Sequence, residues 1–307
     1  MDYSNFIILL ARQRSGTNVL RSVLRDHTDI FCAPEVFDNR MDTNWEVNSG
    51  TDYFNPGEVS YFNFLDKHAR GNLKKVLLLE DHEKIFLDFL EYLRCFTDKK
   101  YLFLDVKYMS THHITECWRF ITEEPFFFSL IKKYNVRVLN LTRRNFLRYY
   151  LSESKSQKAQ RWHEFDESMV GDRPWYNRRR ESVGEKYERR VTVDTDDLLH
   201  ALELCLSENK VVEKSLANYE YYLTFDYDDL FSYIGAPVSD SVLSCIAQWL
   251  NIADDFPQKK PEYKKQSYLP LEETIQNYEE VVQALQETGF EYCLEDEKMY
   301  LNSSVST

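Results

Sequence analysis

The sequence lacks several features that would assign the chain to a common structural class. Its six cysteines are scattered, and none forms a Cys-x-x-Cys pair, so neither a zinc ribbon nor a dense disulfide framework is indicated. We expect reduced thiols and a cytoplasmic location. Repeats of about 20–50 residues and low-complexity tracts are also lacking, which excludes solenoids and propellers.

Long apolar runs and an excess of basic residues are lacking as well. The apolar run near the start spans six residues, 6–11, whereas a membrane-spanning helix needs roughly 20 and an export signal has basic residues before its apolar core. We expect no membrane span. The 38 Lys and Arg residues face 51 Asp and Glu residues, for a net charge of −13. This charge disfavours a general nucleic-acid binder, because the phosphate backbone would repel it.

What is present is a globular composition. The 307 residues are 43% hydrophobic and 29% charged, enough apolar material for a sizeable core. Short β-rich apolar runs at 6–11, 101–106, 136–141 and 221–225 alternate with stretches of helical periodicity. This alternation predicts an α/β fold with a central, mainly parallel sheet flanked by helices in three layers.

The same pass along the chain predicts how the chain is organised. We expect one domain over residues 1–295, interrupted by polar insertions at about 38–60 and 164–190. Residues 296–307 are polar and are expected to be a frayed tail.

The first chemical feature is a strand, a short loop and a helix near the start of the chain. The apolar strand 6–11 is followed by Arg-Gln-Arg-Ser-Gly-Thr-Asn and then by a helix with apolar positions at 19, 20, 23 and 24. Backbone N–H groups at a helix start point outward and attract an anion, which makes this loop P-loop-like. The expected anion ligands are Arg12, Gln13, Arg14, Ser15, Gly16, Thr17 and Asn18.

This loop differs from a nucleotide-triphosphate P-loop. It has one glycine, and Arg14 precedes Gly16 where that motif has a lysine after its last glycine. Gly16 lets the backbone close around an anion, Thr17 adds a hydroxyl, and Arg14 supplies positive charge.

A second basic feature follows the strand predicted at 136–141. Residues 140–161 contain six basic residues and one acid, although the whole chain is acidic. A guanidinium at the carboxyl end of a strand, followed by Ser152 on the next helix, can bind a second phosphate.

Together these two features resemble the 3′-phosphoadenosine 5′-phosphosulfate (PAPS) dependent sulfotransferases, in particular bacterial enzymes of the trehalose- and lipopolysaccharide-sulfotransferase type. In that family the first loop holds the 5′-phosphosulfate, and a later Arg and Ser hold the 3′-phosphate. Arg143 lies nine residues before Ser152 and Arg144 lies eight before it. Either arginine fits the family spacing, and we favour Arg143.

The resemblance extends over some two thirds of the chain. It includes Pro-Glu-Val-Phe at 34–37, where related enzymes keep a catalytic glutamate, and the stretches at 160–163 and 223–230. Lys264 and Lys265 resemble a basic segment near the C-terminus that contributes to donor binding.

The resemblance also implies the roles of individual residues. Glu35 would act as the base that takes the acceptor's proton, and Lys107, at the end of the strand at 101–106, would face the leaving oxygen together with Arg14. His112 and His113 are rival bases, because imidazole titrates near neutrality. No metal is required, since positioning and electrostatic stabilisation suffice for a sulfuryl group.

The sequence therefore predicts an enzyme that moves a sulfuryl group from PAPS to a hydroxyl of a small molecule, with a carbohydrate or glycolipid as the expected acceptor. Two alternatives stay open, a P-loop kinase of small molecules and a non-catalytic module that binds adenosine 3′,5′-bisphosphate. The acceptor's identity and the oligomeric state are not set by any motif.

Overall fold

The structure is a computed structural model that describes residues 2–37, 47–49, 52–54, 58–69, 82–115, 123–159, 164–165, 190–233, 236–257, 263–264 and 269–295. The chain divides into two compact units. The first unit contains Met1–Gln13, Leu24–Leu141 and Val211–Thr224. The second unit contains Arg14–Val23, Thr142–Lys210 and Phe225–Thr307. The single domain over residues 1–295 stays a prediction.

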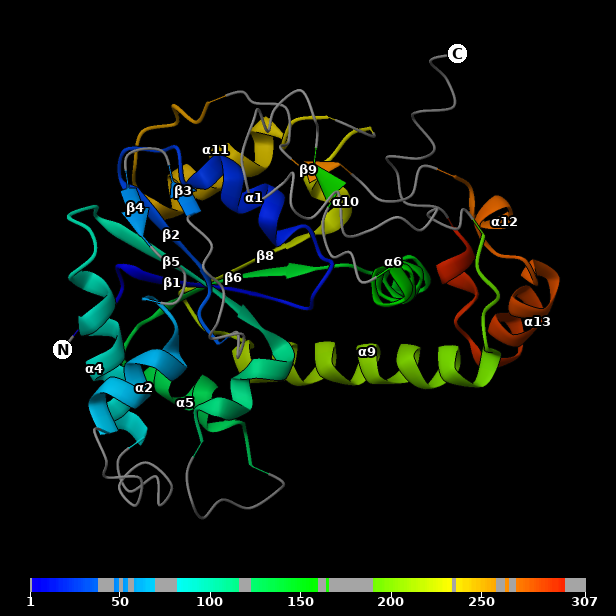
Figure 1. Cartoon of the computed structure of the whole chain (residues 1–307), viewed down its shortest axis with the longest axis horizontal. Helices are drawn as coiled ribbons and strands as arrows, with labels where there is room; N and C mark the ends of the chain where they lie inside the picture. Colours follow the sequence, from blue (N-terminus) through cyan, green and yellow to red (C-terminus); the bar gives the residue numbers. More distant parts are fainter. Residues whose placement is uncertain are drawn as a thin grey trace. The chain divides into compact units, whose positions relative to one another are not determined.

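The centre of the fold is a five-stranded sheet with the order β2-β5-β1-β6-β8 (Figure 1). Its strands are β1 (Phe6–Ala11), β2 (Ile30–Glu35), β5 (Tyr101–Lys107), β6 (Arg137–Thr142) and β8 (Tyr222–Asp226). The pairs β1–β5, β1–β6 and β2–β5 are parallel. Every residue of β1 and β5 is buried, which explains the apolar character of β1 and of the first four residues of β5. The predicted α/β class, with a parallel central sheet flanked by helices, is confirmed.

The helices are the following: α1 (Thr17–Leu24), α2 (Tyr61–Ala69), α4 (His82–Arg94), η1 (Tyr108–His113), α5 (Phe126–Lys133), α6 (Phe146–Ala159), α9 (Thr195–Leu216), α10 (Tyr227–Leu230), α11 (Asp240–Leu250), α12 (Leu271–Thr274), α13 (Tyr278–Thr288) and η2 (Glu291–Leu294).

The first unit has an extensive apolar core against one face of the sheet. Alternate residues of β1, namely Phe6, Ile8 and Leu10, belong to this core, as expected for side chains that share one face of a strand. Helices α2, α4 and α5 supply apolar partners, which include Tyr61, Phe89 and other buried aromatic residues.

The second unit has a separate core that is mainly helical. Leu147 and Leu151 of α6 pack with Leu198 and Leu202 of α9 and with Leu285 of α13. The spacings of four residues place each pair on one helical face. The α6 helix, which carries Ser152, is therefore anchored by its apolar face.

The strands predicted at 6–11, 101–106, 136–141 and 221–225 correspond to β1, β5, β6 and β8, with shifts of at most one residue at an end. The sequence analysis did not predict β2, which contains Pro34. A proline cannot donate a hydrogen bond to a sheet, and β2 is an edge strand, where this is tolerated.

Most of the predicted insertions, and the tail at 296–307, lie outside the described residues. Within the insertions, β3 (Val47–Ser49) pairs antiparallel with β4 (Asp52–Phe54). β7 (Glu164–Phe165) pairs antiparallel with β9 (Tyr263–Lys264). Among the described residues, no helix combines the length and apolar character needed to cross a membrane. The five cysteines described are free thiols.

Candidate functional site

The loop after β1 has the backbone geometry of an anion-binding turn. Arg14 and Gly16 have positive φ angles of 63° and 84°, a backbone region that is uncommon for a residue other than glycine. Val19 N and Leu20 N both donate to the Gly16 carbonyl, at 3.0 and 3.1 Å, and α1 begins at that point. The first N–H groups of a helix lack intrahelical acceptors, and they carry the positive end of the helix dipole. This turn therefore offers an anion several converging donors.

Two hydroxyl groups of the loop are buried. Thr17 is 4% exposed, and Ser15 is 1% exposed. The Ser15 hydroxyl has no hydrogen-bond partner among the described residues. Because buried polar groups are nearly always hydrogen-bonded, a phosphate or sulfate oxygen bound at this turn would be a suitable partner for this hydroxyl.

The structure brings the loop together with two segments far along the chain. The Arg14 side chain donates through Nε to the Ser152 hydroxyl of α6 at 3.0 Å. Arg143, directly after β6, donates through Nη1 to the Arg14 carbonyl at 3.0 Å. Arg143 is 8% exposed, so its guanidinium is held in the interior of the second unit. Three of the residues predicted to bind the phosphates of PAPS thus form one cluster. We call it the phosphate-loop cluster, and it consists of Arg14, Arg143 and Ser152.

Tyr227 packs against this cluster, although the sequence analysis gave it no role. The Arg143 guanidinium lies 4.6 Å from the centre of the Tyr227 ring, within the range of a cation–π contact. A Cβ atom at Gly16 would lie 2.9 Å from a Tyr227 ring carbon, so glycine is required there for space as well as for its φ angle. Tyr227 lies in the stretch at 223–230 that resembles the sulfotransferase family, but that resemblance did not assign a role to the tyrosine.

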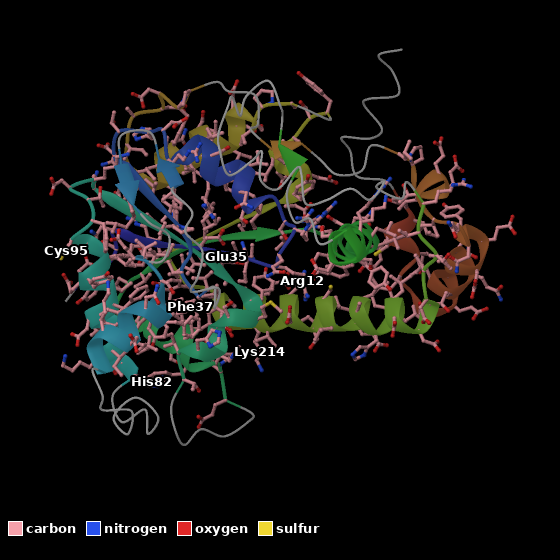
Figure 2. All side chains as sticks on the ribbon, in the orientation of Figure 1. Arg12, Glu35, Phe37, His82, Cys95 and Lys214 are labelled. Atoms are coloured by element: carbon pink, nitrogen blue, oxygen red, sulfur yellow. The ribbon has the colours of Figure 1, made fainter. Side chains whose placement is uncertain are left out.

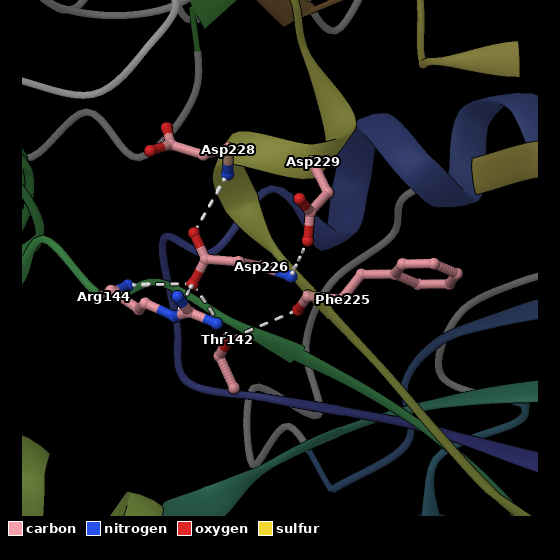
Figure 3. A network of polar contacts seen from close by, with 6 residues as sticks. All are labelled: Thr142, Arg144, Phe225, Asp226, Asp228 and Asp229. Atoms are coloured by element: carbon pink, nitrogen blue, oxygen red, sulfur yellow. Dashed lines mark hydrogen bonds and ion pairs between the residues drawn. The ribbon is translucent and has the colours of Figure 1, made fainter. Parts of the chain in front are cut away.

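A network of polar contacts surrounds Asp226, the residue before Tyr227 (Figure 3). The Asp226 carboxylate accepts hydrogen bonds from the Thr142 hydroxyl at 3.0 Å and from Asp228 N at 3.1 Å. Asp226 N donates to the Asp229 carboxylate at 2.8 Å, which completes a capping box at the start of α10. Burial raises the pKa of Asp226, although its hydrogen bonds oppose this shift. The network links the end of β6 to the helix that carries Tyr227.

Arg144, the alternative 3′-phosphate ligand, is placed differently from Arg143. Its side chain is 84% exposed, and its Nε lies 3.6 Å from the Asp226 carboxylate. Its backbone N donates to the same carboxylate at 3.2 Å. Arg144 therefore belongs to the capping network, and its guanidinium lies at the surface.

The basic character of α6 is partly buried. Arg148 is 3% exposed and donates to the Leu269 carbonyl at 3.0 Å. Lys155 is 5% exposed, and burial, assisted by the positive charge of Arg148, lowers its pKa to about 8. Ser152 lies four residues after Arg148 and three residues before Lys155, so the three side chains share one face of α6.

The first unit contains a second polar cluster at the carboxyl ends of β2 and β5. Ala33 pairs with Leu104, and Glu35 pairs with Asp105, so two residues of β2 oppose one residue of β5. The extra residue is Pro34, which forms a β-bulge. A bulge of this kind re-aims the side chains that follow it, and here it sets Glu35 beside Asp105.

Lys107 joins the two carboxylates of this cluster, which we call the lysine–carboxylate cluster. Its Nζ lies 2.6 Å from the Asp105 carboxylate and 3.3 Å from that of Glu35. The side chains of Lys107 and Asp105 are 5% and 0% exposed, whereas that of Glu35 is 28% exposed. Figure 2 shows Glu35 at the end of β2. The most accessible member is therefore the predicted base.

The rival bases lie at the end of η1, which follows Lys107 directly. His112 is exposed and His113 is half-buried. The His113 ring packs 4.9 Å from the Phe62 ring and 5.9 Å from the Phe37 ring, centre to centre. Burial, followed by the neighbouring His112, lowers the pKa of His113. The choice between Glu35 and these histidines stays a prediction.

The remaining predicted ligands belong to neither of these two clusters. Arg12 and Gln13 are half-buried and follow β1 in the first unit, and the Asn18 side chain accepts a hydrogen bond from Arg21 at 3.3 Å. Lys264 lies in β9. Lys265 and the stretch at 160–163 lie outside the described residues. Among the described residues, no group of three or more His, Cys, Asp or Glu side chains could hold a metal ion.

Comparisons with known proteins do not assign the chain to a family. No model of a known protein family matches the chain, and no curated protein matches it. A solved sulfotransferase from Alicyclobacillus acidocaldarius matches over 96% of this chain and 96% of its own, with 13% sequence identity and a TM-score of 0.42. A likeness this remote carries no argument about function.

Proposed function

We propose that this chain is a sulfotransferase that moves the sulfuryl group of PAPS to a hydroxyl of a carbohydrate or glycolipid acceptor. The observation that carries the proposal is the phosphate-loop cluster, in which Arg14 contacts Ser152 and Arg143 contacts Arg14, at 3.0 Å each. These are the residues that the resemblance assigns to the two phosphates of the donor.

Each residue of the cluster has a role that suits its chemistry. The amides that open α1 and the Ser15 and Thr17 hydroxyls bind the 5′-phosphosulfate, with Arg14 supplying the compensating charge. Arg143 and Ser152 bind the 3′-phosphate. The Tyr227 ring holds the Arg143 guanidinium by a cation–π contact, and a guanidinium forms charge-assisted hydrogen bonds with phosphate.

The lysine–carboxylate cluster is assigned to the transfer step. When bound, the donor supplies a sulfuryl group whose bond to the bridging phosphate oxygen breaks as the acceptor oxygen bonds to sulfur. Glu35 takes the proton of the acceptor hydroxyl, and the Lys107 ammonium stabilises the charge on the leaving oxygen. The accessibility of Glu35 and the burial of Lys107 suit these two roles.

The test of donor binding is titration calorimetry with adenosine 3′,5′-bisphosphate against ATP, with and without Mg²⁺. We expect the bisphosphate to bind and ATP to bind much more weakly under both conditions. Preference for ATP with Mg²⁺ would instead support a small-molecule kinase.

The test of catalysis is the variant Glu35→Gln. Removing a positioned base typically costs about 10²–10⁴-fold in rate, so turnover of PAPS should fall by that amount while bisphosphate affinity stays unchanged. Binding of the bisphosphate without any transfer by the wild-type protein would indicate a non-catalytic binding module. A cytoplasmic location belongs to the same proposal.

A further inference from the structure

The lysine–carboxylate cluster contains one residue without an assigned role. Asp105 lies two residues before Lys107 on β5, so both side chains extend from the same face of the strand. Glu35 is the register partner of Asp105 on β2, which places its side chain on that face too. β5 is an interior strand, between β2 and β1, and its backbone therefore holds Asp105 rigidly.

The two carboxylates hold Lys107 unequally. The Lys107 ammonium donates a hydrogen bond to Asp105 at 2.6 Å, at the short end for a charge-assisted bond between an ammonium and a carboxylate. Its distance of 3.3 Å from Glu35 is an ion-pair contact, longer than the usual hydrogen bond. The Asp105 side chain is fully buried, and a buried charge pair that loses one partner is strongly destabilised.

We propose that Asp105 is a positioning residue: its carboxylate holds the ammonium of Lys107, the group assigned to the leaving oxygen, and thereby keeps the contact between Lys107 and Glu35 long, so that Glu35 can accept the acceptor's proton. This inference rests on the proposed function. Without Asp105, Lys107 would have Glu35 as its nearest carboxylate in the cluster, and the ion pair between them would shorten. The base and the cation would then neutralise each other, and both would serve the transfer step less well.

A double-mutant cycle on turnover tests this role. The variants are Asp105→Asn, Lys107→Met and the combination, and the assay is release of adenosine 3′,5′-bisphosphate from PAPS in the presence of trehalose. We expect Asp105→Asn to lower kcat about 10–100-fold with little change in the KM for PAPS. In the Lys107→Met background the same substitution should cost little, because its effect acts through the lysine. Equal losses in both backgrounds would show a purely structural role and overturn the proposal.

A spectroscopic measurement separates this inference from the proposed function. The ¹⁵N signal of the Lys107 ammonium, which hydrogen bonding protects from exchange, should be nearly the same in the wild type and in Glu35→Gln. It should shift in Asp105→Asn, where Glu35 becomes the partner, and disappear only in the Asp105→Asn, Glu35→Gln double variant. An unchanged signal in Asp105→Asn, in a protein whose thermal unfolding remains cooperative, would refute the role of Asp105. Failure of the wild-type protein to bind the bisphosphate would refute the proposed function instead, and the ammonium signal would still report which carboxylate holds Lys107.

Discussion

Two adjacent arginines after β6 have the same charge and almost the same distance in sequence from Ser152, yet their environments differ. Arg143 is buried against the Tyr227 ring and bonded to the Arg14 carbonyl. The Arg144 side chain is 84% exposed. At the scale of single residues, burial rather than spacing distinguishes the two candidates.

This contrast gives a matched pair of variants. Arg143→Ala should weaken adenosine 3′,5′-bisphosphate binding about 10–100-fold, because a hydrogen bond from a charged group contributes roughly 1.5–3 kcal/mol. Arg144→Ala should change the affinity by less than about threefold, since exposed ion pairs contribute little. Calorimetry on both variants measures the difference. A larger loss in Arg144→Ala would exchange the two assignments.

Lys155 gives a prediction on pH dependence. Burial lowers its pKa from 10.5 to about 8 in the folded chain. Between these values the unfolded chain binds more protons than the folded chain, so this lysine makes the free energy of unfolding rise with pH across that window. The rise should be on the order of 1–3 kcal/mol and absent from Lys155→Met.

Urea unfolding of the wild type and Lys155→Met at pH values below, within and above that window measures this effect. Lys155→Arg is the control, because arginine stays protonated throughout and should also lack the rise. A constant difference between wild type and Lys155→Met across the window would contradict the prediction.

At the scale of elements, the turn between β1 and α1 depends on one glycine for two separate reasons. Gly16 has a φ of +84°, and a Cβ atom there would meet the Tyr227 ring at 2.9 Å. Gly289, which ends α13, has a similar φ of +78° but no atom within 4 Å of the Cβ position. An alanine at Gly16 would therefore introduce both backbone strain and a steric clash, whereas an alanine at Gly289 would introduce backbone strain alone.

We predict that Gly289→Ala lowers the free energy of unfolding by about 1 kcal/mol through backbone strain alone. Gly16→Ala should cost more and should also weaken bisphosphate binding by ~10-fold or more, because the loop amides move away from the anion. Denaturant unfolding and calorimetry on both variants test this. Equal stabilities together with unchanged affinity in Gly16→Ala would show that the loop tolerates displacement.

The elements also show where sequence patterns succeed and fail. Short β-rich apolar runs predicted β1, β5, β6 and β8; β1 and β5 are buried along their whole length, as expected for interior strands of a parallel sheet, whereas β8 is a partly exposed edge strand. β2 was missed, since Pro34 interrupts its pattern. The same proline forms the bulge that sets Glu35 beside Asp105. Pro34 therefore both hides β2 from sequence analysis and determines the geometry of the lysine–carboxylate cluster.

At the scale of the whole molecule, an acidic chain carries a local concentration of basic residues. The net charge is −13, and the cluster of Arg14, Arg143 and Ser152 lies within the second unit. A ligand that neutralises buried cations stabilises the folded state that presents them.

Adenosine 3′,5′-bisphosphate should therefore raise the Tm of the wild-type protein. At a concentration about 100 times the Kd, the expected stabilisation is roughly 2.7 kcal/mol. Thermal unfolding followed by circular dichroism measures the shift, with Arg143→Ala as the comparison at the same ligand concentration. An equal shift in both proteins would place the bisphosphate away from Arg143.

The amino-acid sequence by itself determined the α/β class and the composition from which we predict anion binding by the turn after β1, because strand periodicity and turn residues act over a few neighbouring positions. Only the tertiary structure decided which arginine is buried, that Tyr227 packs against Gly16, and that Asp105 holds Lys107 more closely than Glu35 does. Those outcomes depend on packing, register and a bulge that join segments distant in the chain, and spacing along one strand or helix carries no record of them.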